Sequence, residues 1–126
     1  MAGKQLDGAG TQKLKTIEEA LAQLQRVHGL VERMAVEMKS KQGGSFTAQQ
    51  VKRAATPMVG LLKGQFGIIA DQVSGMLLVA GRGGSEQLKL RALRESVAHI
   101  RTALEIAQNK VKEKHMIEED ADAGGA

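Results

Sequence analysis

The stretch from Met58 to Ala80, MVGLLKGQFGIIADQVSGMLLVA, is the most apolar part of the chain and decides the fold. As a helix it is apolar almost all round, which is typical of a helix inside a bundle. It also contains Lys63 and Asp71, and a charge near the centre of a bilayer costs about 2.5–3.5 kcal/mol. We therefore expect the central helix of a folded domain rather than a membrane span.

Two glycine clusters, Gly43–Ser45 and Gly81–Ser85, separate this stretch from the rest of the chain. Glycine is common just after the C-terminus of a helix, and serine is a preferred N-cap. Each cluster therefore indicates the end of one helix, a turn and the start of the next. The three segments that result are similar in length, which predicts three long helices.

The two outer segments carry heptad seams. The first runs from Thr11 to about Gln42 and the third from Ser85 to about Glu118, and in both the apolar residues recur at alternating steps of three and four. The seam residues are Leu14, Ile17, Leu21, Leu24, His28, Val31, Ala35 and Met38 in the first segment, and Leu90, Leu93, Val97, Ile100, Leu104, Ala107 and Val111 in the third. This spacing places them on one face of a helix, as in a coiled coil.

Pro57 is the single proline and interrupts the middle segment. Proline lacks the N–H of a helical hydrogen bond, and its ring crowds the carbonyl four residues earlier, here that of Arg53. The sequence thus predicts an all-α fold, an antiparallel three-helix bundle of long helices with coiled-coil-like seams, whose middle helix is kinked or broken near Pro57. We expect the bundle over residues 11–118, with flexible tails at 1–10 and at the acidic end, 119–126.

Composition narrows the possible functions. The chain has 126 residues and no Cys, which limits it to one modest core and excludes disulfides, thiolate metal sites and a thiol nucleophile. Two Phe and no Trp or Tyr leave no stacking platforms for nucleic-acid bases. The 18 Lys and Arg against 14 Asp and Glu come without a DNA-reading motif. We expect no cofactor and no specific nucleic acid, and, without an apolar signal segment, a cytoplasmic protein.

Glycines recur along one side of the central stretch. Each glycine inside a helix costs about 0.8–1 kcal/mol relative to alanine, so we expect close approach of another helix to offset that cost. With Asp71, the glycines follow one another at steps of four, three, four and four. The residues predicted to form an interaction face are Gly60, Gly64, Phe66, Gly67, Ile68, Asp71, Gly75 and Leu78.

The apolar central helix also predicts the function, because two neighbouring helices cannot cover its whole surface. We predict a non-enzymatic protein–protein interaction module, a scaffold or adaptor. It is expected to self-associate or to dock onto another helical protein through the predicted face. No strand-to-helix turn presents a serine as a nucleophile, so we expect no catalytic residue. Association with a membrane surface is the alternative.

A second alternative uses histidines. His28 and His99 lie at similar heights if the two outer helices run parallel, and Glu32 and Glu95 lie one turn away from them. These four residues suit a metal site between helices, and a histidine also suits phosphotransfer. The paired Glu-x-x-His pattern of di-iron bundles is absent. The simpler interpretation is that both histidines are half-buried residues that help to fix the register of the helices.

Overall fold

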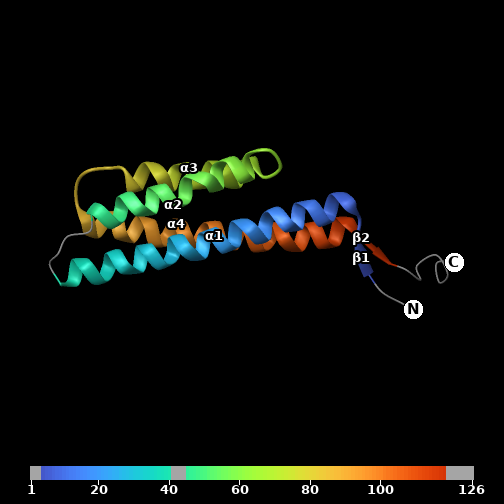
Figure 1. Cartoon of the computed structure of the whole chain (residues 1–126), viewed down its shortest axis with the longest axis horizontal. Coiled ribbons are helices and arrows are strands. Elements are labelled where there is room, and N and C mark those ends of the chain that lie inside the picture. Colours follow the sequence, from blue (N-terminus) through green and yellow to red (C-terminus); the bar gives the residue numbers. More distant parts are fainter. Residues whose placement is uncertain (1–3, 41–44, 119–126) are drawn as a thin grey trace.

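The chain forms a helical bundle. The computed structural model describes residues 4–40 and 45–118. In this part of the chain there are four helices and two three-residue strands: β1 (Lys4–Leu6), α1 (Gly8–Lys39), α2 (Ser45–Lys63), α3 (Gly67–Ala80), α4 (Glu86–His115) and β2 (Met116–Glu118) (Figure 1). The predicted all-α bundle is confirmed, and the predicted count of three helices is wrong.

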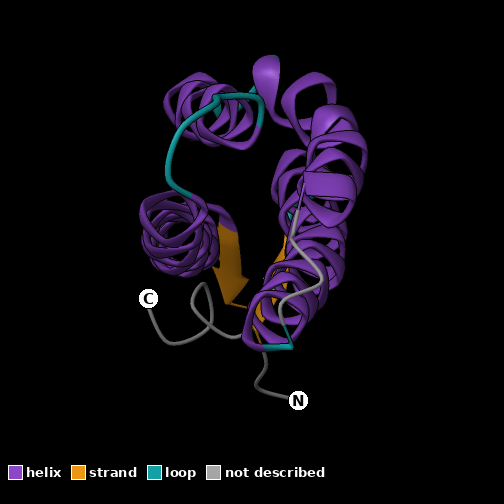
Figure 2. Ribbon diagram, turned by 90° about the vertical axis from the view of Figure 1, so that its left-hand side faces the viewer, coloured by secondary structure: helices purple, strands orange, loops and turns teal. Residues whose placement is uncertain are grey.

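The four helices form a ring (Figure 2), in which sequence neighbours run antiparallel (Figure 1) and α4 packs back against α1. α1 has 32 residues and α4 has 30, whereas α2 has 19 and α3 has 14. At about 1.5 Å per residue, the long pair outreaches the α2–α3 hairpin by roughly 15 Å. The molecule therefore has a four-helix part and a two-helix end, residues 7–16 and 108–115, which leads to the β1–β2 ribbon (Figure 1).

The middle segment divides at Gly64–Phe66 and not near Pro57. α2 continues through Pro57 to Lys63. Pro57 and Arg53 are both exposed, so the carbonyl that proline leaves unpaired faces water, and the helix tolerates it. The Phe66 N–H donates to the Leu62 carbonyl (2.7 Å), and the Phe66 carbonyl accepts from the Ala70 N–H (2.9 Å). These two bonds end one helix and begin the next.

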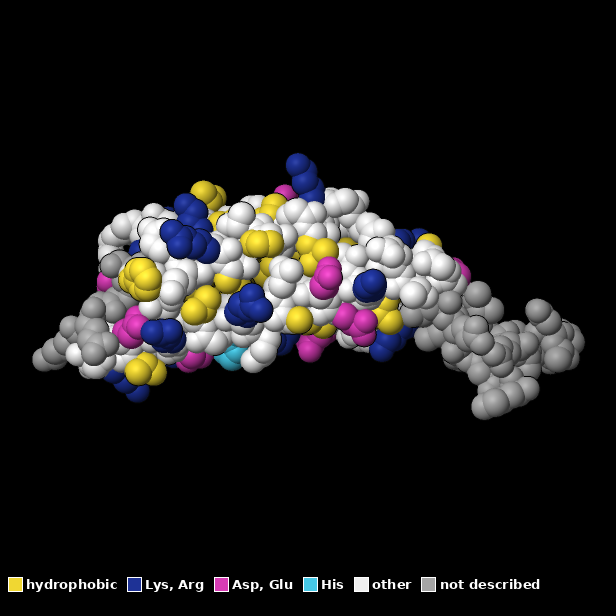
Figure 3. Space-filling model, viewed as in Figure 1, with side chains coloured by type: hydrophobic (Ala, Val, Ile, Leu, Met, Phe, Trp, Pro, Cys, Tyr) yellow, Lys and Arg dark blue, Asp and Glu magenta, His cyan; other side chains and the backbone are white. Residues whose placement is uncertain are grey.

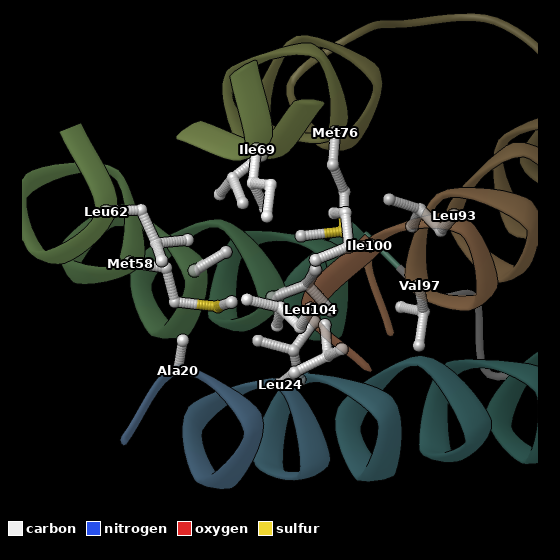
Figure 4. Close-up of a cluster of buried hydrophobic side chains, with 14 of the residues drawn as sticks. Ala20, Leu24, Met58, Leu62, Ile69, Met76, Leu93, Val97, Ile100 and Leu104 are labelled. Atoms are coloured by element: carbon white, nitrogen blue, oxygen red, sulfur yellow. The ribbon is translucent and has the colours of Figure 1, made fainter. Parts of the chain in front are cut away.

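Two short helices bury the apolar residues that the sequence assigned to one long helix. Each has a single buried face, which is why neither needs to be enclosed on every side. The buried apolar residues are Ala48, Val51, Ala55, Met58 and Leu62 on α2, and Ile69, Ala70, Val73, Met76 and Ala80 on α3. Figure 4 shows side chains from both helices meeting those of α1 and α4 at the centre of the four-helix part.

The seams of the outer helices are confirmed in large part. Ile17, Leu24 and Val31 on α1 are fully buried, as are Leu93 and Leu104 on α4. In a four-helix ring these two helices run antiparallel, so the predicted parallel arrangement is wrong.

One end of each outer helix differs from the prediction. α1 begins earlier than expected, and α4 ends earlier than expected. α1 starts at Gly8 with Asp7 as its N-cap, rather than at Thr11, and α4 ends at His115. Residues 4–10 therefore belong to regular structure rather than to a tail. Gly43, Gly44 and the predicted tail at 119–126 lie outside the described residues.

Candidate functional site

An apolar groove lies where the α2–α3 hairpin ends above α4. It has a volume of about 380 Å³. Its lining residues are Gln65, Phe66, Gly67, Ile68 and Ile69 from the hairpin tip, and Ala103, Ile106, Ala107 and Lys110 from α4. Because α4 continues past the tip, the groove is open towards the two-helix end. We call it the step groove.

Two isoleucines project from the step groove into solvent. Ile68 is 80% exposed and Ile106 is 50% exposed, although burial of an isoleucine is worth about 1.5–3 kcal/mol. The next residue along α3, Ile69, is only 7% exposed, because successive residues of a helix point about 100° apart. Ile69 and the half-buried Phe66 therefore anchor the hairpin tip to the core, while Ile68 is left for another contact.

Charges lie on both sides of these isoleucines. Lys110 is the one charged side chain among the residues that line the step groove, and it lies one turn past Ile106 on α4. Asp71 is exposed on α3 and lies one turn past Ile68. α3 and α4 run in opposite directions (Figure 1), so Asp71 lies towards the four-helix part and Lys110 towards the two-helix end.

The structure places the eight predicted interaction residues in three groups. Phe66, Gly67 and Ile68 line the step groove. Asp71, Gly75 and Leu78 lie on the exposed face of α3, and Gly60 and Gly64 lie on exposed positions of α2 and its C-terminal turn.

The glycines do not serve packing within the chain. A Cβ atom added at Gly60, Gly64, Gly67 or Gly75 meets no atom within 4 Å. The predicted close approach of helices at these glycines is therefore wrong inside one copy of the chain, because all four point into open space. Contact with another molecule stays a prediction.

The sequence missed the α4 side of the step groove. Ile106 lies between the seam residues Leu104 and Ala107, and it is the off-seam apolar residue of that turn. An isoleucine off the buried face was the available signal. Ala103 lies one turn before Ile106 and is half-buried. Because its side chain is small, it leaves space in the groove.

A larger hollow of about 820 Å³ lies between the end of α1 and the start of α4, but its chemistry is mixed. Its lining includes Lys39 and Arg91 as well as Glu86 and Glu95. It is therefore a solvated polar surface, unlike the step groove, whose lining is mostly apolar.

The structure does not bring the four residues of the predicted metal site together within the described part of the chain. His28 Nε2 lies 3.9 Å from Glu32 Oε2, but both Glu32 oxygens accept bonds from Arg94, at 2.7 and 2.9 Å. The hydrogen bond from Arg94 is the main cause that lowers the pKa of Glu32. His99 is exposed. Among residues 4–40 and 45–118, no three His, Asp or Glu side chains lie close enough together to hold a metal ion.

A cluster of polar contacts holds the two-helix end closed. Asp7 Oδ1 accepts from the Gly10 N–H (2.6 Å) as the N-cap of α1, and the Asp7 N–H donates to the His115 carbonyl (3.0 Å). His115 Nδ1 lies 3.2 Å from Asp7 Oδ2, and its Nε2 lies 3.4 Å from Lys13 Nζ. A neutral imidazole with its proton on Nδ1 satisfies both contacts. We call these residues the terminal clasp.

Gly10 gives the terminal clasp its close fit. It is buried, and a Cβ added there overlaps the His115 Cβ. The backbone N–H of Gly10 is also the main cause that lowers the pKa of Asp7. The sequence missed the clasp because its partners are 108 residues apart and because residues 1–10 looked like a tail.

Comparison with known proteins gave no match to a family model, to a curated protein or to a solved structure. The helices add one physical finding. Within the described part of the chain, none is long and apolar enough to cross a bilayer.

Proposed function

We propose that this chain is a non-enzymatic helical protein–protein interaction module, a scaffold or adaptor, that binds its partner at the step groove. The cytoplasm remains its predicted compartment. The observation that carries the proposal is the exposure of Ile68 and Ile106 on either side of an apolar groove. A groove with a fixed floor and projecting apolar rims is a common docking site for an amphipathic helix.

The magnitudes favour a modest affinity. Full burial of an isoleucine contributes about 1.5–3 kcal/mol, whereas association costs about 4–15 kcal/mol in lost motional freedom. Ile68 and Ile106 alone therefore cannot hold a partner. The contact must extend beyond them, over the exposed face of α3 or along the two-helix end.

The layout of apolar side chains favours a protein partner over a membrane surface. A helix that lies on a bilayer needs a continuous apolar face. On α3, Ile68 and Leu78 are both exposed, at 80% and 70%, but the exposed residues between them are Asp71, Gln72 and Gly75. The space-filling view likewise shows scattered apolar side chains among charged ones on the visible face (Figure 3).

Site-specific photo-crosslinking in the cells that make the protein tests the proposal. A photoreactive amino acid at Ile106 is expected to give discrete adducts, identified by mass spectrometry, that the same residue at Arg53 does not give. Arg53 is a suitable control because it is exposed on α2, away from the groove. Adducts that are the same at both positions, or none at Ile106, would contradict a docking role for the groove.

A further inference from the structure

We infer that the step groove binds a second copy of this chain, and that the Ile68 side chain of each copy fills the groove of the other. This inference rests on the proposed function and names the partner. Each copy supplies both halves of the contact, because Ile68 projects beyond the groove that Phe66, Ile69 and Ile106 line. Such an isologous contact is symmetric and closes at two copies.

The positions of two charged side chains favour a second copy of the chain as the partner. Asp71 lies on one side of the isoleucine pair along the molecule, and Lys110 lies on the other, because α3 and α4 are antiparallel (Figure 1). A two-fold axis that lies in the plane of contact, perpendicular to the helices and between the Ile68 side chains of the two copies, exchanges the two sides. It therefore brings Asp71 of each copy opposite Lys110 of the other, so that two pairs of opposite charges flank the apolar centre.

The arrangement is self-complementary in a way that an unrelated partner does not require. If the charges on the two sides of the isoleucines had the same sign, the two-fold axis would bring like charges together and the copies would repel each other. Here the single charged residue of the groove is a lysine, and the charged residue on the exposed face of α3 is an aspartate. Each copy therefore contributes the aspartate to one intermolecular ion pair and the lysine to the other.

The exposed glycines support the same contact. Gly64 and Gly67 lie at the hairpin tip, and Gly75 lies on the exposed face of α3, and none has a neighbouring atom where its Cβ would be. Within one copy nothing offsets the conformational cost of glycine in or beside a helix. Without side chains at these positions, the backbone of a second α3 can approach closely enough for Ile68 to reach the opposite groove.

Molar mass in solution tests the pairing directly. Light scattering over a concentration series is expected to show the chain rising from its monomer mass of 13.4 kDa towards twice that value. Ile68→Asp is expected to remain monomeric at every concentration. Leu88→Asp is the matched control, because Leu88 is an exposed leucine (63%) near the start of α4, on a different helix from Ile68 and outside the groove, and it is expected to dimerise like the wild type.

Charge reversal tests whether the two intermolecular ion pairs contribute to dimer affinity in addition to the apolar contact. Asp71→Lys and Lys110→Asp are each expected to weaken the dimer about tenfold, because by symmetry each acts at two contacts. The double variant Asp71→Lys/Lys110→Asp restores both pairs with reversed sign, and its dissociation constant is expected to return to the wild-type value. Circular dichroism of each variant checks that the fold is intact.

Several outcomes would overturn the inference. A wild-type chain that stays monomeric contradicts it, as does a dimer that Leu88→Asp disrupts and Ile68→Asp does not, or a double variant that fails to recover. Monomers that co-sediment with phosphatidylglycerol vesicles through Ile68 would replace it with a lipid contact. A monomeric chain whose Ile106 crosslinks specifically to a different protein overturns the second copy but leaves the proposed function standing.

Discussion

The four-helix part and the two-helix end are held together by different physics. In the four-helix part, large side chains such as Met58, Leu62 and Met76 are at most 1% exposed and fill the space between four helices (Figure 4). In the two-helix end, the buried side chains are few and small, and the polar contacts of Asp7 and His115 close the structure. One region depends on apolar burial, and the other on hydrogen bonds and close backbone approach.

The comparison shows how a pair of helices can extend beyond its bundle. Two helices alone cannot enclose large apolar side chains, so a two-helix region needs small residues and specific polar contacts instead. Regions with few buried apolar contacts also open more readily than the core. We therefore expect the two-helix end to open before the four-helix part unfolds.

The largest effect is expected in the core of the four-helix part. Leu104 is fully buried, so Leu104→Ala is expected to lower the free energy of unfolding by about 2–5 kcal/mol through lost burial and a residual cavity. Chemical denaturation followed by circular dichroism measures it. Ile106→Ala is the control on the same helix, since Ile106 is 50% exposed and its truncation costs much less. Equal losses for the two variants would contradict the assignment of the core.

The next largest effect is expected at the two-helix end. Gly10→Val places a side chain where the His115 Cβ already lies, and overpacking of this kind costs about 1–3 kcal/mol. Because the clash is local, hydrogen exchange is expected to accelerate at the start of α1 and the end of α4 and to change little at Leu24 or Leu93. Gly8→Val is the control, because a Cβ at Gly8 meets no atom within 4 Å.

The contrast also explains what the sequence could predict. The outer helices were predictable because their buried residues, from Ile17 to Met34 and from Leu93 to Val111, repeat with the period of a helix. The break at Gly64–Phe66 was missed because its signals, the polar Lys63 and Gln65 and the two glycines beside them, also fit one continuous helix with glycines at helical spacing. Only the packing of two short helices against α1 and α4 shows that the pattern belongs to two faces rather than one.

The candidate site was predictable on one side only. Phe66, Gly67 and Ile68 follow from the glycine-rich apolar stretch, since they lie within it. Ile106 and Lys110 join them because the hairpin ends above the middle of α4, and that depends on the relative lengths of four helices. The terminal clasp could not be predicted either, because its contacts join residues that are 108 positions apart in the sequence.

A smaller effect is expected at the exposed glycines of the four-helix part. Gly60→Ala and Gly75→Ala add a methyl group in open space on a helix, so each is expected to raise the free energy of unfolding by about 0.4–1 kcal/mol through loss of freedom in the unfolded chain. Thermal unfolding at a low protein concentration, where copies do not associate, measures this. A loss of stability at Gly60 would mean that a neighbour fills this space.

The smallest and most local effect is the acid response of the terminal clasp. The Gly10 N–H is the main cause that lowers the pKa of Asp7 in the folded chain. Stability from this carboxylate is therefore fully present above its unfolded pKa of about 3.9 and is lost as the pH falls through the lower, folded value. Hydrogen-exchange protection of the two-helix end, corrected for intrinsic rates, is expected to fall progressively as the pH drops below about 5, through the unfolded pKa and then the lower folded pKa of Asp7.

Asp7→Asn separates this titration from that of other carboxylates. Asparagine also caps a helix N-terminus but does not ionise, so the variant is expected to keep the cap and to lose part of the acid response at the two-helix end. Protection of the four-helix part is expected to change alike in both proteins, because Asp7 lies outside it. If wild type and variant lose protection in parallel as the pH falls, Asp7 does not control the two-helix end, and apolar contacts such as those of Val111 must hold it instead.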